Sequence, residues 1–357
     1  MIYRPVEMLR ALVSTPSPSR EENATADLIA ESLECNGVKT RRFRNCVWAV
    51  QPTHDPRKPT LMLNSHHDTV KPASGYIRDP YDAAIEGDRL YGLGSNDAGA
   101  SVVTLMQLFV DHYLKRLPFN LMLAITAEEE VMGPDGMRGF LPHIQSIGFQ
   151  PDMVLVGEPT DMQPAVAERG LVVLDCSAHG VSGHAARKNG VNALYKAMAD
   201  IDVIRRLRFP RESAVLGPVG LEVTMIKCGT QHNVIPDRCD FTVDVRTTDA
   251  YTNEETVMMI RRAIQSDAVP RSTRIQASVI DYSHPLVLAA EAIGGTPFVS
   301  PTTSDMALMH GIPSLKMGPG HSQRSHTADE YVLLSEIREA LEKYPEFLKA
   351  LSRLMTD

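Results

Sequence analysis

Side chains that bind metal ions or transfer protons recur in short segments along the sequence. The first segment is Asn64-Ser65-His66-His67-Asp68, which follows the apolar run Thr60-Leu61-Met62-Leu63. In an extended chain alternate side chains face the same way, so His66 and Asp68 share one side and His67 faces the other. A carboxylate two residues from an imidazole can hold the second ring nitrogen, as in many metal sites. The alternative interpretation is a turn with solvated polar residues at the end of a strand.

Further segments place carboxylates or an imidazole after other apolar runs. They are Asp97 after a glycine-containing turn, Glu128-Glu129-Glu130 after the run that ends at Thr126, Glu158 in Gly157-Glu158-Pro159-Thr160, and His326 in Ser325-His326-Thr327-Ala328-Asp329-Glu330. Taken singly, the acidic residues also suit a helix N-cap, a solvated helix start or a turn. Together they would repel one another at one edge unless a cation neutralised them. Oxygen and imidazole donors without a thiol favour zinc, cobalt or manganese over a structural zinc site.

The elements around these residues predict an α/β sheet. We expect strands at 38–43, 46–51, 60–64, 89–93, 120–126 and 153–156, a helix at 98–115, and a helix that ends at Gly37 and begins at a capping box with Ser19 as N-cap and Glu22 as its partner. Uninterrupted apolar strands are typical of a sheet covered on both faces, and their alternation with helices indicates a largely parallel sheet. Ligands bind beyond the carboxyl ends of the strands in such sheets, which is where the candidate residues fall.

The pattern changes at about Arg169. Strands are expected at 171–178, 220–226, 238–245 and 274–280, with helices at 192–207 and 253–264. The order strand, helix, strand, strand, helix, strand is that of a ferredoxin-like α+β unit. The α/β pattern returns from Tyr282 and closes with a helix over 333–354. We therefore predict a catalytic domain of 1–168 and 282–357, interrupted by an inserted domain of 169–281.

Composition and charge describe an ordinary globular protein. The chain has 357 residues, of which 43% are hydrophobic and 22% charged, enough for more than one domain with a sizeable core. A net charge of −8, with one short basic run at 39–44 that suits an exposed edge strand, argues against a nucleic-acid partner. No apolar run approaches the roughly 20 residues of a membrane span. Five cysteines without a Cys-x-x-Cys pair favour reduced thiols in the cytoplasm.

The ordered motifs resemble those of the two-metal amidohydrolase and peptidase family that includes acetylornithine deacetylase and succinyl-diaminopimelate desuccinylase. Besides the segments above, the resemblance rests on Gly183-His184, Asn233-x-Ile235-Pro236 and Asp244-x-Arg246. It spans nearly the whole chain. The segments 63–70, 94–100 and 229–237 look most like the short acetylornithine or succinylornithine deacylases of arginine biosynthesis. One departure is Ala98-Gly99-Ala100, where many relatives have Met-Lys-Gly.

The resemblance implies two divalent metal ions, zinc first with cobalt or manganese as alternatives. By position, Asp97 would bridge the two ions, His66 and Glu158 would complete one site, and Glu130 and His326 the other. Asp68 would orient His66. Glu129 would be the general base that takes a proton from the metal-bridging water and gives it to the leaving amine. The run of three glutamates leaves open whether Glu128 and Glu129 fill these roles instead of Glu129 and Glu130.

The resemblance also implies roles for the inserted domain. In the family this domain mediates dimerisation, and a histidine matching His184 stabilises the oxyanion in the partner's active site. Asn233 and Arg246 would contact the substrate, with Arg246 pairing the α-carboxylate in bidentate fashion. From the residues alone, a surface arginine and a loop histidine without a role are the alternatives.

The predicted activity is removal of an acetyl or succinyl group from an N2-acyl-L-amino acid, first of all N2-acyl-ornithine or the corresponding citrulline. A succinyl-diaminopimelate desuccinylase, or a dipeptidase or carboxypeptidase of the same family, would use the same machinery. A non-catalytic binding protein is the third hypothesis, and the presence of every candidate ligand and of Glu129 argues against it. The expected partners are a small-molecule substrate and a second copy of the chain in a homodimer, without nucleic acid or membrane.

Overall fold

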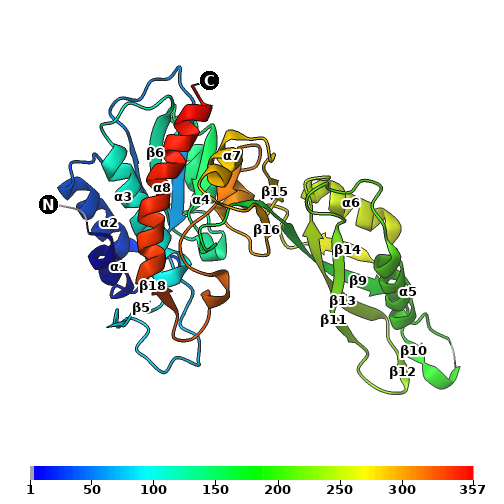
Figure 1. Ribbon diagram of the computed structural model, residues 1–357. Helices are drawn as coiled ribbons and strands as arrows, with labels where there is room; N and C mark the ends of the chain where they lie inside the picture. The colour runs from blue at the N-terminus through cyan, green and yellow to red at the C-terminus, as the bar shows by residue number, and fades with distance from the viewer. Residues whose placement is uncertain (1–3, 188, 357) are drawn as a thin grey trace. The chain divides into compact units, whose positions relative to one another are not determined.

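The computed structural model describes residues 4–187 and 189–356. The chain divides into two compact units, the first reaching to Val166 and resuming at Ile280, the second spanning Ala167–Val279 (Figure 1). The inserted unit therefore covers 167–279, where the sequence predicted 169–281.

Within the described residues, the first unit is built on a nine-stranded sheet. Its strands, in spatial order, are β1 (Arg41–Phe43), β2 (Cys46–Val50), β6 (Asn120–Thr126), β3 (Thr60–His66), β7 (Met153–Val156), β17 (Ser314–Lys316), β8 (Ala165–Glu168) and β15 (Ser278–Val279), with β16 (Phe298–Ser300) also paired to β8. The four central strands β6, β3, β7 and β17 run parallel, and the outer pairs β1–β2, β2–β6, β17–β8 and β8–β15 are antiparallel. The predicted mostly parallel α/β sheet is confirmed.

Helices cover both faces of this sheet, which is why its central strands are apolar throughout. One face packs against α1 (Pro5–Val13), α2 (Asn23–Cys35), α3 (Ala100–His112), α7 (Pro285–Ala292) and α8 (Leu334–Leu354), and the other against α4 (Met137–Ser146) and the short helix η4 (Asp305–Leu308). Along β3, Leu61 and Leu63 join the first core and Met62 the second. Full burial of such a side chain stabilises the fold by about 1.5–3 kcal/mol. None of the described helices is long and apolar enough to cross a bilayer.

The capping box predicted at Ser19 is wrong. Helix α2 begins at Asn23, with Glu22 as its N-cap residue. The Ser19 hydroxyl donates instead to Oδ2 of Asp68 at 2.7 Å, and the buried Glu22 carboxylate accepts from the Asn45 amide at 2.9 Å. The local pattern predicted that Ser19 and Glu22 cap the helix. Both side chains instead form tertiary hydrogen bonds to loops near the strand ends.

A smaller three-stranded sheet lies in the same unit. It has the order β18 (Tyr331–Leu333), β5 (Arg89–Tyr91) and β4 (Ile85–Glu86), all antiparallel. The strand expected at 89–93 is therefore part of this sheet and not of the central one. Because β5 precedes Asp97 and β18 follows His326, the sheet joins the two segments that carry these residues.

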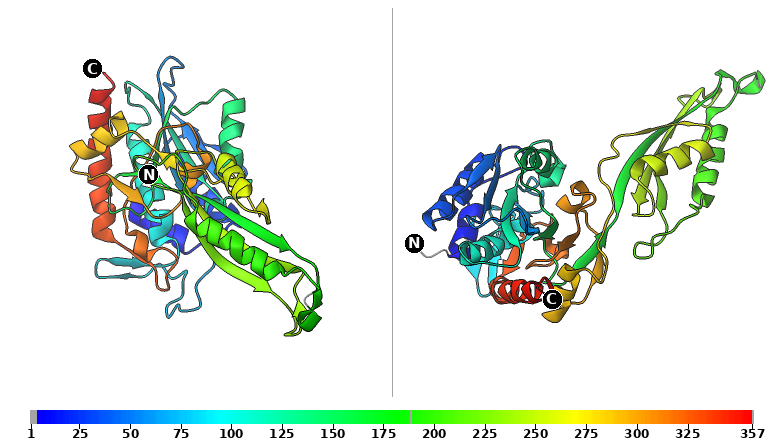
Figure 2. Two further views of the ribbon diagram at one scale, coloured as in Figure 1. Left: turned by 90° about the vertical axis from the view of Figure 1, so that its right-hand side faces the viewer. Right: turned by 90° about the horizontal axis from the view of Figure 1, so that it is seen from above.

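The second unit is a four-stranded antiparallel sheet with helices α5 (Ala193–Arg206) and α6 (Asn253–Ala263) on one face (Figure 2). The strand order is β11 (Gly220–Cys228), β13 (Arg238–Thr247), β9 (Gly170–His179) and β14 (Asp267–Pro270). This is the predicted ferredoxin-like element order, with one correction. The last strand of this sheet is 267–270 and not 274–280. The Asn253 side chain binds the carbonyls of Thr273 and Ile275, and Ser278–Val279 forms β15 of the central sheet instead.

Candidate metal centre and active site

Three adjacent parallel strands deliver the candidate residues to one edge of the central sheet. The register pairs His66 of β3 with Thr126 of β6, and Asn64 of β3 with Val156 of β7. His66 is the last residue of β3, the glutamate run follows β6, and Glu158 follows β7. Because carboxyl ends of parallel strands share an edge, residues that are far apart in sequence meet here.

His66 lies at the centre of the first group of donors. Its Nε2 is 3.2 Å from Oδ1 of Asp97 and 3.7 Å from Oε1 of Glu158. Its Nδ1 is 3.1 Å from the carbonyl oxygen of Asp68 and 3.4 Å from the Oδ1 atom of the same residue. The buried Asp68 carboxylate also accepts the backbone N–H groups of Glu129 and Glu130 at 3.0 and 3.2 Å. One carboxylate thus positions both the imidazole and the glutamate loop.

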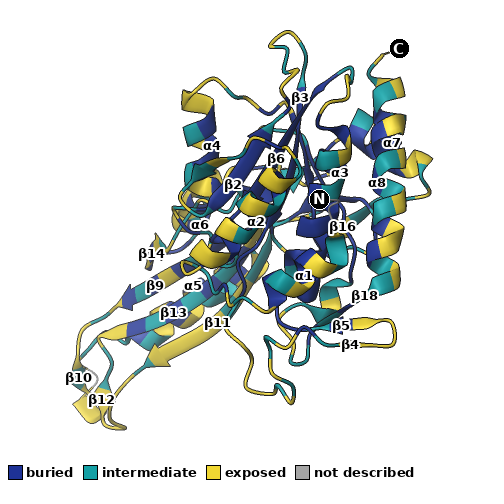
Figure 3. Ribbon diagram, turned by 90° about the vertical axis from the view of Figure 1, so that its left-hand side faces the viewer, coloured by how far each residue is buried: buried dark blue, intermediate teal, exposed yellow. Residues whose placement is uncertain are grey.

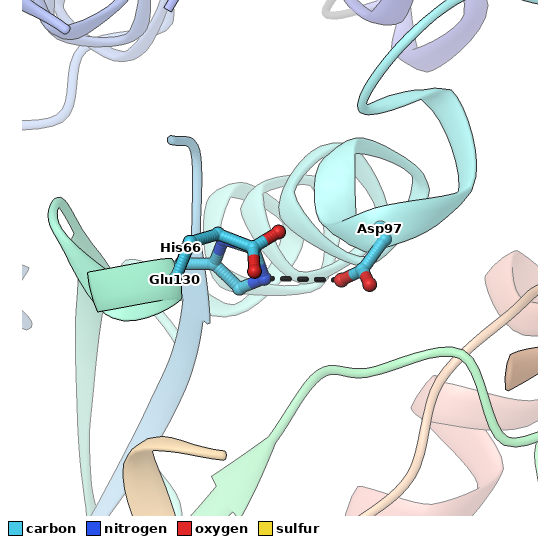
Figure 4. Close-up of side chains that lie close together, drawn as sticks. All are labelled: His66, Asp97 and Glu130. Carbon is cyan, nitrogen blue, oxygen red and sulfur yellow. Dashed lines mark hydrogen bonds and ion pairs between the residues drawn. The ribbon is translucent and has the colours of Figure 1, made fainter. Parts of the chain in front are cut away.

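The second group of donors meets the first at Asp97, which lies in a short turn, Ser95–Gly99, before α3. Oδ2 of Asp97 is 3.7 Å from Nε2 of His326, and that nitrogen is 2.9 Å from Oε2 of Glu130. The two oxygens of Asp97 therefore face different imidazoles. His66, Asp97 and Glu130 each offer an atom within 4.8 Å of the others (Figure 4). The His326 side chain is 54% exposed, so the donor group is open to solvent at this residue.

Charge is crowded at this edge of the sheet. Burial raises the pKa of Glu158 to about 8 and, with the charge of Glu158 and other carboxylates adding to it, that of Glu129 well above its usual range. Burial alone would lower the pKa of His66, but the charge of Glu129 and hydrogen bonds to Asp68 and Asp97 raise it well above the ordinary value. The hydrogen bond to Glu130 raises the pKa of His326 to about 9. Without a cation, several of these carboxylates and imidazoles would have to be protonated to relieve their repulsion. Such a set of donors therefore fits divalent cations.

The three consecutive glutamates point in different directions. Glu128 has a φ of 54°, and its Oε2 accepts the Asp135 N–H at 3.1 Å, so this side chain folds back on its own loop. Glu130 belongs to the donor group with His66 and Asp97. Glu129 is 7% exposed, and its carboxylate interacts electrostatically with the His66 ring. The loop thus uses Glu128 internally and directs the other two carboxylates to the candidate site.

Most of the chain matches a known protein family. The model of peptidase family M20/M25/M40 matches residues 62–350. The chain belongs to this family. Family membership, with the donor group at the sheet edge, identifies a metal-dependent hydrolase of the M20 type that acts on amide bonds.

Two relatives in sequence cover almost all of the chain. The succinyl-diaminopimelate desuccinylase of Acidiphilium cryptum is 26% identical over 98% of this chain and 99% of its own length. The acetylornithine deacetylase of Shigella sonnei is 28% identical over 92% of both. These identities support the M20 hydrolase class.

Solved M20 structures share the fold. The aminopeptidase PepT of Bacillus cereus superposes with a TM-score of 0.77 at 17% identity, covering 98% of each chain. A dinuclear metal-binding peptidase of the M20 family from Bacillus subtilis gives 0.73 at 16% identity, covering 99% of this chain and 98% of its own. The arrangement of the elements is therefore that of the M20 family.

A buried carboxylate that the motifs left without a role supports the Asp97 turn. Glu330 is 1% exposed and accepts the backbone N–H groups of Gly94, Asn96 and Asp97 at 3.2, 2.8 and 2.9 Å. Burial, followed by the charge of Asp97, raises the pKa of Glu330 to about 8. Its position four residues after His326 was the only signal in the sequence.

Asp305 is a second functional candidate without a role in the motifs. It is 2% exposed, and its Oδ2 accepts from the Thr126 hydroxyl at 2.7 Å and from the Asn64 amide at 3.4 Å. These two residues lie on neighbouring strands near their carboxyl ends, so Asp305 links β3 and β6. Burial raises the pKa of Asp305 to about 6. No local pattern marks such a residue, because its partners are distant in sequence.

The three remaining candidates, His184, Asn233 and Arg246, belong to the second unit. His184 lies in β10 (Gly183–His184), which pairs with β12 (Val234–Ile235), and the N–H of Ala185 donates to the Asn233 carbonyl at 3.0 Å. The structure thus brings His184 and Asn233 together, and both are exposed. Arg246 is on β13, where Nε donates to Oδ1 of Asp244 at 2.7 Å.

Proposed function

We propose that the protein removes the acetyl or succinyl group from an N2-acyl-L-amino acid, with N2-acyl-ornithine or the corresponding citrulline as the first candidate substrate. The observation that carries the proposal is Asp97 between two imidazoles, His66 and His326, beside the buried carboxylate of Glu129. Desuccinylase and deacetylase names among relatives at 26% and 28% identity support an acylated amino acid as the substrate.

The site suits two divalent ions, zinc first with cobalt or manganese as alternatives. His66 and Glu158 would hold one ion, Glu130 and His326 the other, and Asp97 both. When bound, such ions polarise the amide carbonyl and lower the pKa of water.

Glu129 is the proposed general base and acid. It takes a proton from the attacking water and passes that proton to the departing nitrogen, so that the amine leaves neutral. Its raised pKa suits this role, because a carboxyl group that exchanges a proton near neutral pH serves both steps. Asp68 keeps the His66 ring in place throughout.

Side chains of the inserted unit are the proposed substrate contacts. Arg246 would exchange its intrastrand partner Asp244 for the α-carboxylate of the substrate, which a guanidinium binds in bidentate fashion. Asn233 is a further substrate contact, and His184 the donor to the developing oxyanion. The exposure of all three side chains leaves them available for these contacts.

We also propose that the inserted unit mediates a homodimer. Strand β11 is an edge of its sheet, and much of it is exposed (Figure 3). Its exposed apolar residues include Met225 (64%) and Ile226 (53%). Tyr195 (69%) and Met198 (55%) add to this on α5. An exposed edge strand pairs readily with another strand, and a second copy of β11 offers the same edge and the same apolar side chains. A cytoplasmic location stays a prediction from the cysteine pattern.

A substrate screen tests the proposed activity. The purified protein, reconstituted with zinc, cobalt or manganese, is assayed with acetyl and succinyl derivatives of ornithine, citrulline, lysine and diaminopimelate, and with dipeptides. We expect the ornithine or citrulline derivatives to be hydrolysed fastest, activity to vanish with a chelator, and metal to restore it. Fastest turnover of succinyl-diaminopimelate or of dipeptides would establish the alternative named above. No hydrolysis at full metal occupancy would favour a binding protein.

A further inference from the structure

Two cysteines of the second unit face each other across neighbouring strands. Cys228 ends β11 and Cys239 lies near the start of β13, and the antiparallel register pairs them directly. The Cys239 thiol donates to the Cys228 sulfur, and the Cys228 thiol donates to the Arg238 carbonyl at 3.4 Å. Cys239 is fully buried, whereas Cys228 is partly exposed.

The register places these thiols within reach of a covalent bond. Directly opposed residues of antiparallel strands have Cα atoms about 4.5–5.5 Å apart, and disulfides span about 4.4–6.8 Å. Cys176, the other cysteine of this sheet, has Phe241 and Ala268 as its register partners and no cysteine. The geometry therefore selects one pair among the five free cysteines.

The segment between the two cysteines carries a proposed substrate contact. Residues 229–238 contain Asn233 and β12, and β12 pairs with the strand of His184. A bond between Cys228 and Cys239 would close this segment into a loop at its base. It would restrict the loop, and none of the candidate metal ligands belongs to that loop, since they all lie in the first unit.

We propose that Cys228 and Cys239 form a modification site, at which hydrogen peroxide converts the two thiols into a reversible disulfide. The Cys228 thiolate attacks one peroxide oxygen, the O–O bond breaks, and a sulfenic acid and one water result. The Cys239 sulfur then attacks the Cys228 sulfur, the S–O bond breaks and a second water leaves. Two electrons pass from the sulfurs to the peroxide, and the two thiol protons end in the waters.

The order of the steps follows from exposure. Peroxide reaches the partly exposed Cys228 first, whereas Cys239 is enclosed by the sheet and its helices. Burial also raises the pKa of Cys239 to about 12, so its thiol is a poor first nucleophile. Cys239 serves as the resolving thiol because it is held against the sulfur that is oxidised.

Peptide mapping of the full-length protein tests the modification. The folded protein is treated with hydrogen peroxide, unreacted thiols are alkylated under denaturing conditions, and trypsin is added. Cleavage after Lys227, Arg238 and Arg246 places the two cysteines in separate peptides, 228–238 and 239–246. We expect these peptides to be joined, to separate with dithiothreitol, and two thiols per chain to be lost. Hydrogen exchange of the backbone in 229–238 should slow on oxidation.

Matched variants and outcomes decide the proposal. Cys228→Ser and Cys239→Ser should each abolish the linked peptides, while Cys176→Ser and Cys35→Ser should leave them unchanged. The proposal is overturned if peroxide consumes thiols without linking these peptides, or if it links Cys176 or Cys35 equally well. The mapping of the unaltered chain remains a valid test even if a variant fails to fold. If Asn233 contacts the substrate, oxidation should also change KM while the metal content stays the same. Only this kinetic consequence rests on the proposed function.

Discussion

The candidate residues of the two units differ in how they are held. In the first unit Asp68, Asp97 and Glu330 lie in a network of buried hydrogen bonds with fixed backbone donors. In the second unit His184 and Asn233 are exposed on a small two-stranded sheet. Side chains that hold a metal ion must already be in position, because rearranging charged ligands would cost part of the free energy of metal binding. Side chains that meet a substrate or a partner stay solvated until that contact forms.

The largest effect is expected inside the buried network. Glu129→Gln should lower kcat by about 10²–10⁴-fold, because the amide cannot move the proton in either step, and bound metal should stay unchanged. Glu130→Gln should lose metal instead. Elemental analysis and steady-state rates of both variants measure the difference, with Glu128→Gln as the matched control. If Glu129→Gln loses metal and Glu128→Gln loses only rate, the assignment is off by one residue.

The next effect concerns the exposed region. His184→Ala should bind metal normally and turn over about 10²–10³-fold more slowly, the usual cost of losing an oxyanion donor. If His184 serves the partner's site, mixing this variant with Glu129→Gln should restore activity, because a mixed dimer holds one site with both defects and one with neither. No recovery despite demonstrated subunit exchange would mean that the site is not shared between chains.

Glu330 tests whether the buried network determines metal affinity. Glu330→Gln removes a charged acceptor from three backbone donors of the Asp97 turn, and outer partners of this kind typically change metal affinity by about 10–100-fold. Competition with a chelating dye measures the dissociation constant without any assay of activity. Glu86→Gln, an exposed carboxylate on β4, should leave it unchanged. Equal affinity of the two variants would remove Glu330 from the site.

Strand β13 carries a matched pair of arginines, Arg246 and Arg238. Arg246 pairs with Asp244, and Arg238 pairs with Asp240 at the same spacing and with similar distances of 2.7 and 2.8 Å. Arg246→Lys should raise KM by about tenfold with little change in kcat, because an ammonium ion cannot bind a carboxylate in bidentate fashion. Arg238→Lys should leave KM unaltered. A similar KM for both variants would mean that Arg246 is an ordinary surface residue.

The smallest effect is expected where a single hydroxyl supports the network. Ser19→Ala removes the donor to Asp68 and should lower the free energy of unfolding by about 1 kcal/mol, with metal binding retained. Denaturant titration measures this change, and Ser14→Ala, an exposed serine after α1, serves as the control. Equal stability of the two variants would show that water replaces the hydroxyl without loss.

The sequence by itself determined the parallel sheet and the residues at its edge. Apolar runs such as Leu121 to Ile125 require burial on both faces, and the chain places His66, Glu130 and Glu158 directly after such runs. Parallel strands present their carboxyl ends together, so residues after each strand had to meet. The ferredoxin-like order of the inserted unit followed from the same local periodicities.

Only the tertiary structure decided which polar groups serve which role. Ser19 lies in a capping pattern yet donates to Asp68. The segment 274–280 has the composition of a strand of the inserted sheet, yet its only strand, Ser278–Val279, pairs with β8 in the central sheet. Glu330 and Asp305 support the site through partners far away in the chain. Hydrogen bonds between distant segments leave no periodic trace in a sequence, because only the folded backbone brings donor and acceptor within 3 Å of each other.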